Sequence, residues 1–148
     1  MAFSTDDTVR ALLLLMPRLV GRAKRLGVPA ALRGHDLAPR HLSLLAYLQF
    51  EGSLTVGELA ERLEIAPTTV SLMVADLSRG GILVRREDDT DRRRRIVAIA
   101  PDQLAAVDAW LGGSAAAWRT ALHGTTSAER ETVVRVLRAY ERALGEQR

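Results

Sequence analysis

The segment from Thr55 to Ala100 limits most strongly what this chain can fold into. A short helical pattern is followed by a turn of three or four residues, a second helical pattern, a double glycine and two β-prone runs around an arginine-rich turn. This order predicts a helix-turn-helix followed by a β-hairpin, which together form a winged helix-turn-helix. We therefore predict a mainly α fold with a small β-hairpin wing, in the α+β class.

Local signals mark the ends of the two helices. Thr55 and Glu58 form a capping box at the start of the first helix. Ile65 is the apolar residue of the turn and is expected to fill the space between the helices. Pro67 suits the first position of the second helix because its φ is already helical, and the pair Gly80-Gly81 accepts the left-handed backbone of a helix end. One face of the second helix repeats apolar residues at i, i+3, i+4 and i+7, which predicts a buried stripe of Val70, Met73, Val74 and Leu77.

The opposite face of the second helix is nearly free of charge. Its residues are small, polar or apolar: Thr68, Thr69, Ser71, Leu72 and Ala75. Hydroxyl groups exchange hydrogen bonds with base edges in the major groove of DNA, and a leucine can contact a thymine methyl group. Because a solvated helix face usually carries Glu, Lys and Arg, we interpret this helix as a DNA recognition helix. The alternative is an ordinary amphipathic helix with a polar outer face.

The hairpin combines arginines with acidic residues. We predict strands at Ile82–Arg86 and Arg95–Ile99, with Arg93 and Arg95 on one side and Arg92 and Arg94 on the other. An arginine at the tip can enter a narrow minor groove while its neighbours pair with phosphates, and Arg93 is the preferred candidate. The predicted DNA-binding residues of the wing are Asp91, Arg92, Arg93, Arg94 and Arg95. In the alternative interpretation, the hairpin is solvated and its arginines are neutralised by Glu87, Asp88, Asp89 and Asp91.

Helical patterns flank the winged segment on both sides. They predict helices from Asp6 to about Arg25, from Pro39 to Phe50, from Pro101 to about His123, and a last helix after a capping box at Thr126 and Glu129. The first and the last two carry more apolar residues than a small winged domain can cover. We therefore predict one domain over residues 1–148, with residues 1–25 and 101–148 forming a dimerisation lobe and 39–100 the DNA-binding lobe. Alternatively, these helices complete a monomeric core.

The composition excludes several classes of protein. The sequence of 148 residues contains no cysteine, so disulfides, thiolate metal sites and cysteine-based redox sensing are excluded. The formal charge is only +3, so the case for nucleic acid depends on local clustering in the wing. The apolar run from Ala11 to Met16 is too short to span a bilayer, and we expect a soluble cytoplasmic protein without membrane contact.

In its order of parts, the chain resembles the MarR family of bacterial transcription regulators. The resemblance is carried by the helix-turn-helix of residues 55–81, by Leu83-Val84-Arg85-Arg86, and by Asp91-Arg92-Arg93, which matches an Asp-x-Arg signature in the wing. It implies homodimers that bind double-stranded DNA at pseudo-palindromic operators, often as repressors. It also implies release by a small aromatic or phenolic ligand between the two lobes. Many members carry a polar or basic residue where this chain has Leu72.

Residues outside the winged segment suggest candidates for other sites. Arg18, Arg22, His41, Tyr47 and Trp110 are candidates for an effector pocket, as partners for an anion or as stacking surfaces. His35, His41 and His123 lie in separate elements, and the one adjacent pair, His35-Asp36, is poorly arranged for a metal, so we expect no metal site and no cofactor. No set of residues suited to catalysis is evident. A winged-helix module that binds protein and not DNA is the alternative function.

Overall fold

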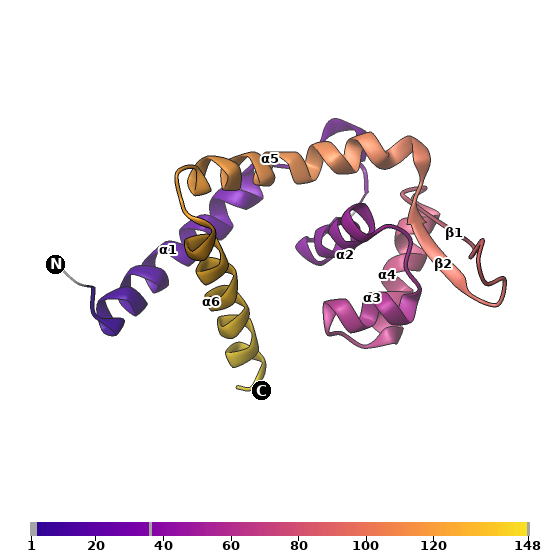
Figure 1. Cartoon of the computed structure of the whole chain (residues 1–148). Coiled ribbons are helices and arrows are strands. Elements are labelled where there is room, and N and C mark those ends of the chain that lie inside the picture. The colour runs from indigo at the N-terminus through magenta and orange to yellow at the C-terminus, as the bar shows by residue number, and fades with distance from the viewer. Residues whose placement is uncertain (1–2, 36, 148) are drawn as a thin grey trace. The chain divides into compact units, whose positions relative to one another are not determined.

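The computed structural model describes residues 3–35 and 37–147. Its elements are α1 (Thr5–Arg25), α2 (Pro39–Glu51), α3 (Val56–Leu63), α4 (Pro67–Arg79), β1 (Leu83–Glu87), β2 (Arg95–Ile99), α5 (Leu104–Leu122) and α6 (Ser127–Gly145), with 3₁₀ turns at Ala30–Leu32 and Pro101–Gln103 (Figure 1). The predicted mainly α fold with a β-hairpin wing is confirmed. The chain divides between Ser114 and Ala115 into two compact units.

Hydrogen bonds of the predicted capping box set the start of α3. The Thr55 hydroxyl accepts a hydrogen bond from the Glu58 N–H (3.1 Å), and the Glu58 carboxylate accepts one from the Thr55 N–H (3.2 Å). The helix ends at Leu63, and Glu64 then takes a left-handed φ of 54°. The expectation that Ile65 fills the space between the helices is wrong. Its side chain is 37% exposed after this reversal, and Leu63 packs against the core instead.

The core of the first unit lies between α2, α3, α4 and the hairpin. The predicted stripe of α4 is confirmed, since none of its members is more than 4% exposed: Val70, Met73, Val74 and Leu77. They belong to one cluster with Leu44, Leu45 and Leu48 of α2 and with Leu59 and Ala60 of α3. Each buried valine or leucine stabilises the fold by about 1.5–3 kcal/mol relative to exposure. This core therefore holds α4 firmly and leaves its opposite face exposed.

The two glycines after α4 differ in what a side chain at each would meet. Gly81 has a φ of 76°, where L side chains are strained, so the predicted left-handed backbone is present at this residue. Gly80 has an ordinary helical φ of −75°, and here the reason for glycine is space. A Cβ atom at Gly80 would lie 2.8 Å from Nδ1 of His35.

The wing is an antiparallel hairpin in which β1 pairs with β2 from Leu83↔Ile99 to Glu87↔Arg95. Its base is attached to the segment before α3, because Leu54 and Val97 exchange two backbone hydrogen bonds of 3.1 and 2.7 Å. Ile82, predicted as the first residue of the strand, precedes β1.

The predicted alternation of the wing arginines is wrong for three of the four residues. Arg92, Arg93 and Arg94 lie in the turn that joins the strands, and β2 begins only at Arg95. Two-residue periodicity requires a pleated strand, and the backbone here is instead bent by a hydrogen bond from the Arg94 N–H to the Asp91 carbonyl (3.0 Å).

The first and last helices, α1 and α6, are called the outer helices below, and each begins at its own capping box. α1 begins one residue before its predicted start and is capped by Ser4, whose hydroxyl accepts a hydrogen bond from the Asp7 N–H (3.1 Å). The predicted capping box before α6 is confirmed, with bonds of 2.7 and 3.2 Å between Thr126 and Glu129. No described residue of either helix is buried. Both expose apolar side chains, including Val9, Leu13 and Leu14 on α1 and Val134, Val136 and Tyr140 on α6.

Candidate nucleic-acid interface

The face of α4 that points away from the core is open to solvent. Four of the five predicted recognition residues are exposed and Ala75 is half-buried: Thr68, Thr69, Ser71, Leu72 and Ala75. Leu72 is 68% exposed, although the next apolar residues of the same helix are fully covered. An exposed leucine on the same face as three hydroxyl side chains forms a surface that can make both hydrogen bonds and methyl contacts with base edges.

This face carries little charge. The acidic residue of α4, Asp76, is paired with Arg79 one turn further on, through an ion pair between exposed side chains. A carboxylate on a helix that enters the major groove would repel phosphates, and this pairing neutralises it. The recognition face is therefore suited to close approach to DNA, but it supplies little electrostatic attraction of its own.

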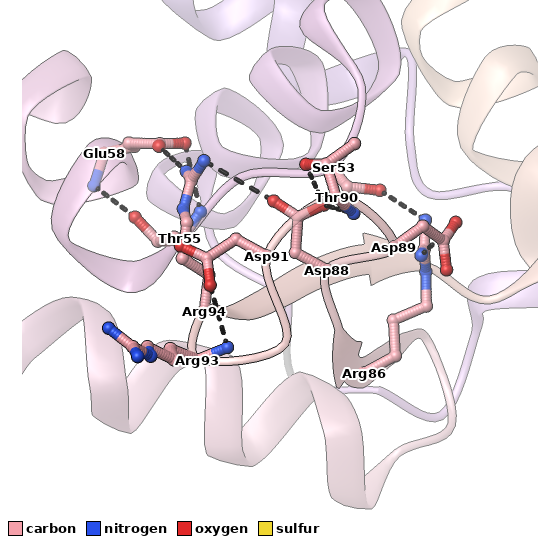
Figure 2. Close-up of polar contacts among 10 residues, drawn as sticks. All are labelled: Ser53, Thr55, Glu58, Arg86, Asp88, Asp89, Thr90, Asp91, Arg93 and Arg94. Atoms are coloured by element: carbon pink, nitrogen blue, oxygen red, sulfur yellow. Dashed lines mark hydrogen bonds and ion pairs between the residues drawn. The ribbon is translucent and has the colours of Figure 1, made fainter.

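Two aspartates shape the wing turn through short-range hydrogen bonds (Figure 2). Asp91 Oδ1 accepts a hydrogen bond from the Arg93 N–H (3.0 Å). Asp88 Oδ1 accepts bonds from the Thr90 N–H (3.0 Å) and the Thr90 hydroxyl (2.9 Å). The backbone N–H of Thr90, followed by its hydroxyl and the charges of Arg94 and Arg86, holds the pKa of Asp88 below its usual value. Asp91 thus organises the backbone at the residue predicted to enter the minor groove.

The wing arginines fall into two groups according to their partners. Arg94 forms a hydrogen-bonded ion pair with Glu58 of α3 and a second ion pair with Asp88 (3.4 Å). Arg95 lies 3.8 Å from the Glu87 carboxylate across the hairpin. In contrast, the structure shows no hydrogen bond or ion pair for the guanidinium groups of Arg92 and Arg93, in a part of the chain that is fully described. In Figure 2 the Arg93 side chain points away from the other charged groups of the turn.

Sequence reasoning missed two residues that hold the wing from outside it. Glu58 contacts Arg94, and Ser53 accepts a hydrogen bond from Arg86 (3.2 Å), which also pairs with Asp89 (3.4 Å). The partners lie 36 and 33 residues apart in the chain. Only the Thr55-Glu58 capping box identifies Glu58 in the sequence, and that signal concerns the helix.

The five predicted effector residues lie in three helices of the first unit. Arg18 and Arg22 are exposed on α1, and Trp110 of α5 packs against the core cluster. The Tyr47 hydroxyl donates to the Arg62 carbonyl (3.2 Å), and the buried His41 accepts a hydrogen bond at Nδ1 from the Ala38 N–H (2.8 Å). Tyr47 and His41 therefore already have structural contacts. A role in ligand binding stays a prediction for all five.

A hollow lies beside the wing. It has a volume of about 320 Å³ and is lined by Val56, Arg85, Arg95, Ile96 and Val97. The arginines come from the two paired strands, and the apolar residues form the rest of the lining. Guanidinium groups beside apolar side chains suit a small anion that carries an aromatic ring.

Within residues 3–35 and 37–147 no group of three His, Asp or Glu is arranged to hold a metal ion. Asp36, considered above with His35, lies outside the described residues. No helix in the described part of the chain is long and apolar enough to cross a membrane.

Comparisons with known proteins agree with this geometry. Residues 35–94 match a family model described as MarR family. The repressor MdtR of Bacillus subtilis (strain 168), described as an HTH-type transcriptional repressor, is 40% identical over 57 residues. These residues are 38% of this chain and 37% of MdtR, so the match spans little more than a third of the relative's length.

Solved structures extend the likeness to nearly the whole chain. NMB1585, a MarR family regulator from Neisseria meningitidis, has a TM-score of 0.64 at 18% identity and covers 98% of this chain and 96% of its own. PcaV, a transcriptional regulator from Streptomyces coelicolor solved with its natural ligand, has a TM-score of 0.63 at 17% identity, with coverage of 97% and 99%. At these identities the likeness shows a common fold.

Proposed function

We propose that this chain, which belongs to the MarR family of transcription regulators, is a cytoplasmic homodimeric repressor that binds a pseudo-palindromic DNA operator and is released by a small aromatic or phenolic ligand. The observation that carries the proposal is the pairing of two surfaces in the first unit. One is the exposed, nearly uncharged face of α4, and the other is the wing turn with the unpaired guanidinium groups of Arg92 and Arg93. Direct readout of bases and attraction to the DNA backbone are thus supplied by separate elements.

The roles follow from the chemistry of each element. Thr68, Thr69 and Ser71 read base edges in the major groove, and Leu72 contacts a thymine methyl group. Arg93 enters the adjacent minor groove, where the negative potential is strongest, and Arg92 pairs with a phosphate. Asp91 acts indirectly, through its hydrogen bond to the Arg93 N–H.

The homodimer is supported by the apolar surface of the outer helices. α1 and α6 have no buried residue among those described, and the side chains they expose include Leu13, Leu14 and Tyr140. Helices that expose many large apolar side chains are expected to be covered by a partner, and a second copy of the chain provides a symmetric one. The dimer presents its recognition helices about 34 Å apart, one turn of DNA.

The oligomeric state is tested by sedimentation equilibrium. Leu137→Arg on α6 places a charge in the proposed interface and is expected to produce monomers. Arg138→Ala, next to it in the chain, is the matched control and is expected to leave the dimer intact. A wild-type chain that sediments as a monomer at micromolar concentration contradicts the homodimer.

Ligand release is supported by PcaV, a neighbour in fold that was solved with its natural ligand. The proposed ligand residues are those predicted from the sequence, and the hollow beside Arg85 and Arg95 is a second candidate. Salicylate is a suitable probe because it combines a carboxylate with a phenol. If salicylate weakens DNA binding, loss of this effect in Arg22→Ala or in Arg85→Ala identifies the site.

DNA binding itself is tested by titrating salt. The proposal predicts binding of micromolar protein to the DNA upstream of its own gene, with an affinity that falls steeply as salt rises. A winged-helix module that binds protein is the alternative, and it predicts no salt-sensitive binding to any duplex.

A further inference from the structure

We propose that Arg94 is a positioning residue: its guanidinium, held between the carboxylates of Glu58 and Asp88, fixes the wing turn on the start of α3 and so directs Arg93 toward DNA. These three residues are called the Arg94 cluster below. The inference rests on the proposed function for the final step only, because the contacts of the cluster exist without DNA.

The cluster joins two elements that the backbone does not join. The base of the hairpin is attached to the segment before α3 by the backbone hydrogen bonds between Leu54 and Val97. The turn beyond Glu87 and Arg95 lies outside the paired strands. Nη2 of Arg94 reaches Oε1 of Glu58, while Nη1 lies 3.4 Å from Oδ2 of Asp88 (Figure 2). One guanidinium therefore bridges the helix and the turn.

Both carboxylates are also held in place by hydrogen bonds that do not involve Arg94. Oε2 of Glu58 accepts the capping hydrogen bond from the Thr55 N–H, which leaves Oε1 for Arg94. Oδ1 of Asp88 accepts both hydrogen bonds from Thr90, which leaves Oδ2. Fixed carboxylates reduce the conformational entropy that is lost when the ion pairs form.

The position of Arg94 is transmitted to Arg93 through the backbone. The Arg94 carbonyl accepts a hydrogen bond from the Asp88 N–H (3.0 Å), and the Arg94 N–H donates to the Asp91 carbonyl (3.0 Å). Asp91 in turn accepts the hydrogen bond from the Arg93 N–H (3.0 Å). An Arg94 that is fixed at both its backbone and its side chain leaves the preceding residue little freedom.

A direct phosphate contact by Arg94 is the competing role, and the cluster argues against it. Arg94 would have to leave two carboxylates, one of which, Asp88, is only 16% exposed at its side chain. Arg92 and Arg93 have no such ties. The structure therefore divides the arginines of the turn into two whose guanidinium groups have no partner in the described chain and one that holds the turn.

The two roles predict opposite effects of Glu58→Gln on DNA binding. Glutamine keeps the capping box, since it can still accept from the Thr55 N–H, but it removes the charge that holds Arg94. If Arg94 holds the turn, Glu58→Gln and Arg94→Ala each weaken binding by about two- to fivefold, the range that corresponds to a half-exposed ion pair. If Arg94 contacts phosphate, Glu58→Gln frees it and strengthens binding. Glu61→Gln removes the same charge from α3 outside the cluster and serves as the control.

Salt titration and a double variant sharpen the test. Arg93→Ala is expected to lower the slope of log K against log salt by about 1. Arg94→Ala added to Arg93→Ala is expected to leave the slope unchanged, because Arg94 itself contacts no phosphate. The double variant Glu58→Gln/Arg94→Ala is expected to bind as Arg94→Ala does, because both changes remove one interaction. Tighter binding by Glu58→Gln relative to the Glu61→Gln control, or a further fall in slope when Arg94→Ala is added to Arg93→Ala, overturns the proposal.

Amide hydrogen exchange gives a measurement without DNA. The N–H groups of Asp88 and Arg94 are expected to exchange several-fold faster in both Glu58→Gln and Arg94→Ala, with unchanged exchange in the α4 core. Unchanged exchange in the turn overturns the positioning role, whatever the DNA result. Faster exchange in a chain that binds no DNA instead overturns the proposed function and the direction of Arg93 toward DNA.

Discussion

Leu72→Ala is expected to change which DNA sequences are bound while leaving the fold nearly as stable. The Leu72 side chain is 68% exposed, so about a third of its area is buried. Full burial of a leucine contributes about 1.5–3 kcal/mol, so this fraction contributes roughly 0.5–1 kcal/mol. The higher helix propensity of alanine offsets part of the loss. We expect the free energy of unfolding to fall by less than about 1 kcal/mol.

Leu77→Ala is the matched control on the same helix. Leu77 is 4% exposed and lies in the core, so its truncation is expected to cost about 2–5 kcal/mol. Urea denaturation measures both variants. The contrast tests whether the exposed leucine serves the fold or the surface.

The contact between Leu72 and a thymine methyl group is tested with uracil in place of thymine. This replacement removes one methyl group and changes nothing else on the base edge. If Leu72 covers that methyl group, each half-site loses about 0.8 kcal/mol, or roughly fourfold in affinity, when the contacted thymine is replaced. Leu72→Ala is expected to bind the thymine and uracil sites equally.

The assay is fluorescence anisotropy on an operator located by footprinting the upstream DNA, with each thymine replaced by uracil in turn. One position per half-site is expected to matter to the wild type and not to Leu72→Ala. The reasoning is refuted if no replacement weakens the wild type, or if both proteins lose the same affinity at every position.

Three further predictions concern the wing, its pH dependence and the helix end. Arg93→Ala is expected to weaken binding to specific and random duplexes alike, whereas Thr69→Ala is expected to change the preference among sequences; equal effects of both variants in a competition assay would contradict these roles. Hydrogen bonds from Thr90 lower the pKa of Asp88 in the folded chain. The stabilisation of the turn by these bonds is therefore fully present above the ordinary pKa of 3.8, and it is lost as pH falls through the lowered pKa. Carboxyl NMR titration measures this, and an Asp88 that titrates at or above 3.8 refutes it. Gly81→Ala is expected to cost about 1–2 kcal/mol because φ is 76°, while the control Gly57→Ala in α3 is expected to stabilise by up to about 1 kcal/mol in thermal unfolding; equal shifts would exclude backbone strain as the cause.

The helix-turn-helix could be predicted because its signals are local. The two members of a capping box lie three positions apart, and the buried stripe of α4 repeats within one helix. Each is an interaction between near neighbours in the chain, so sequence spacing alone is enough to identify it. The same reasoning located the exposed face of α4 as the complement of its buried stripe.

The division of labour among the wing arginines could not be predicted. Sequence reasoning preferred Arg93 but gave Arg92 and Arg94 the same kind of contact with DNA. It also applied strand alternation to all three residues, although they lie in the turn before β2. What separates them is Glu58, which lies 36 residues earlier and reaches Arg94 only after the helix and the hairpin have packed together. The candidate effector residues come from three helices, and sequence spacing within one helix carries no information on contacts between helices.

Because the Glu58 carboxylate serves both α3 and the hairpin, neither element can be replaced separately by its counterpart from another regulator without loss of a contact. One oxygen completes the cap of α3, and the other holds Arg94. A wing grafted from another regulator would bring its own turn but would find a carboxylate placed for this arginine. A helix grafted alone would leave Arg94 without its partner on α3. Position 58 and position 94 should therefore vary together as such proteins diverge, so that a single substitution at either one is retained less often than a paired change.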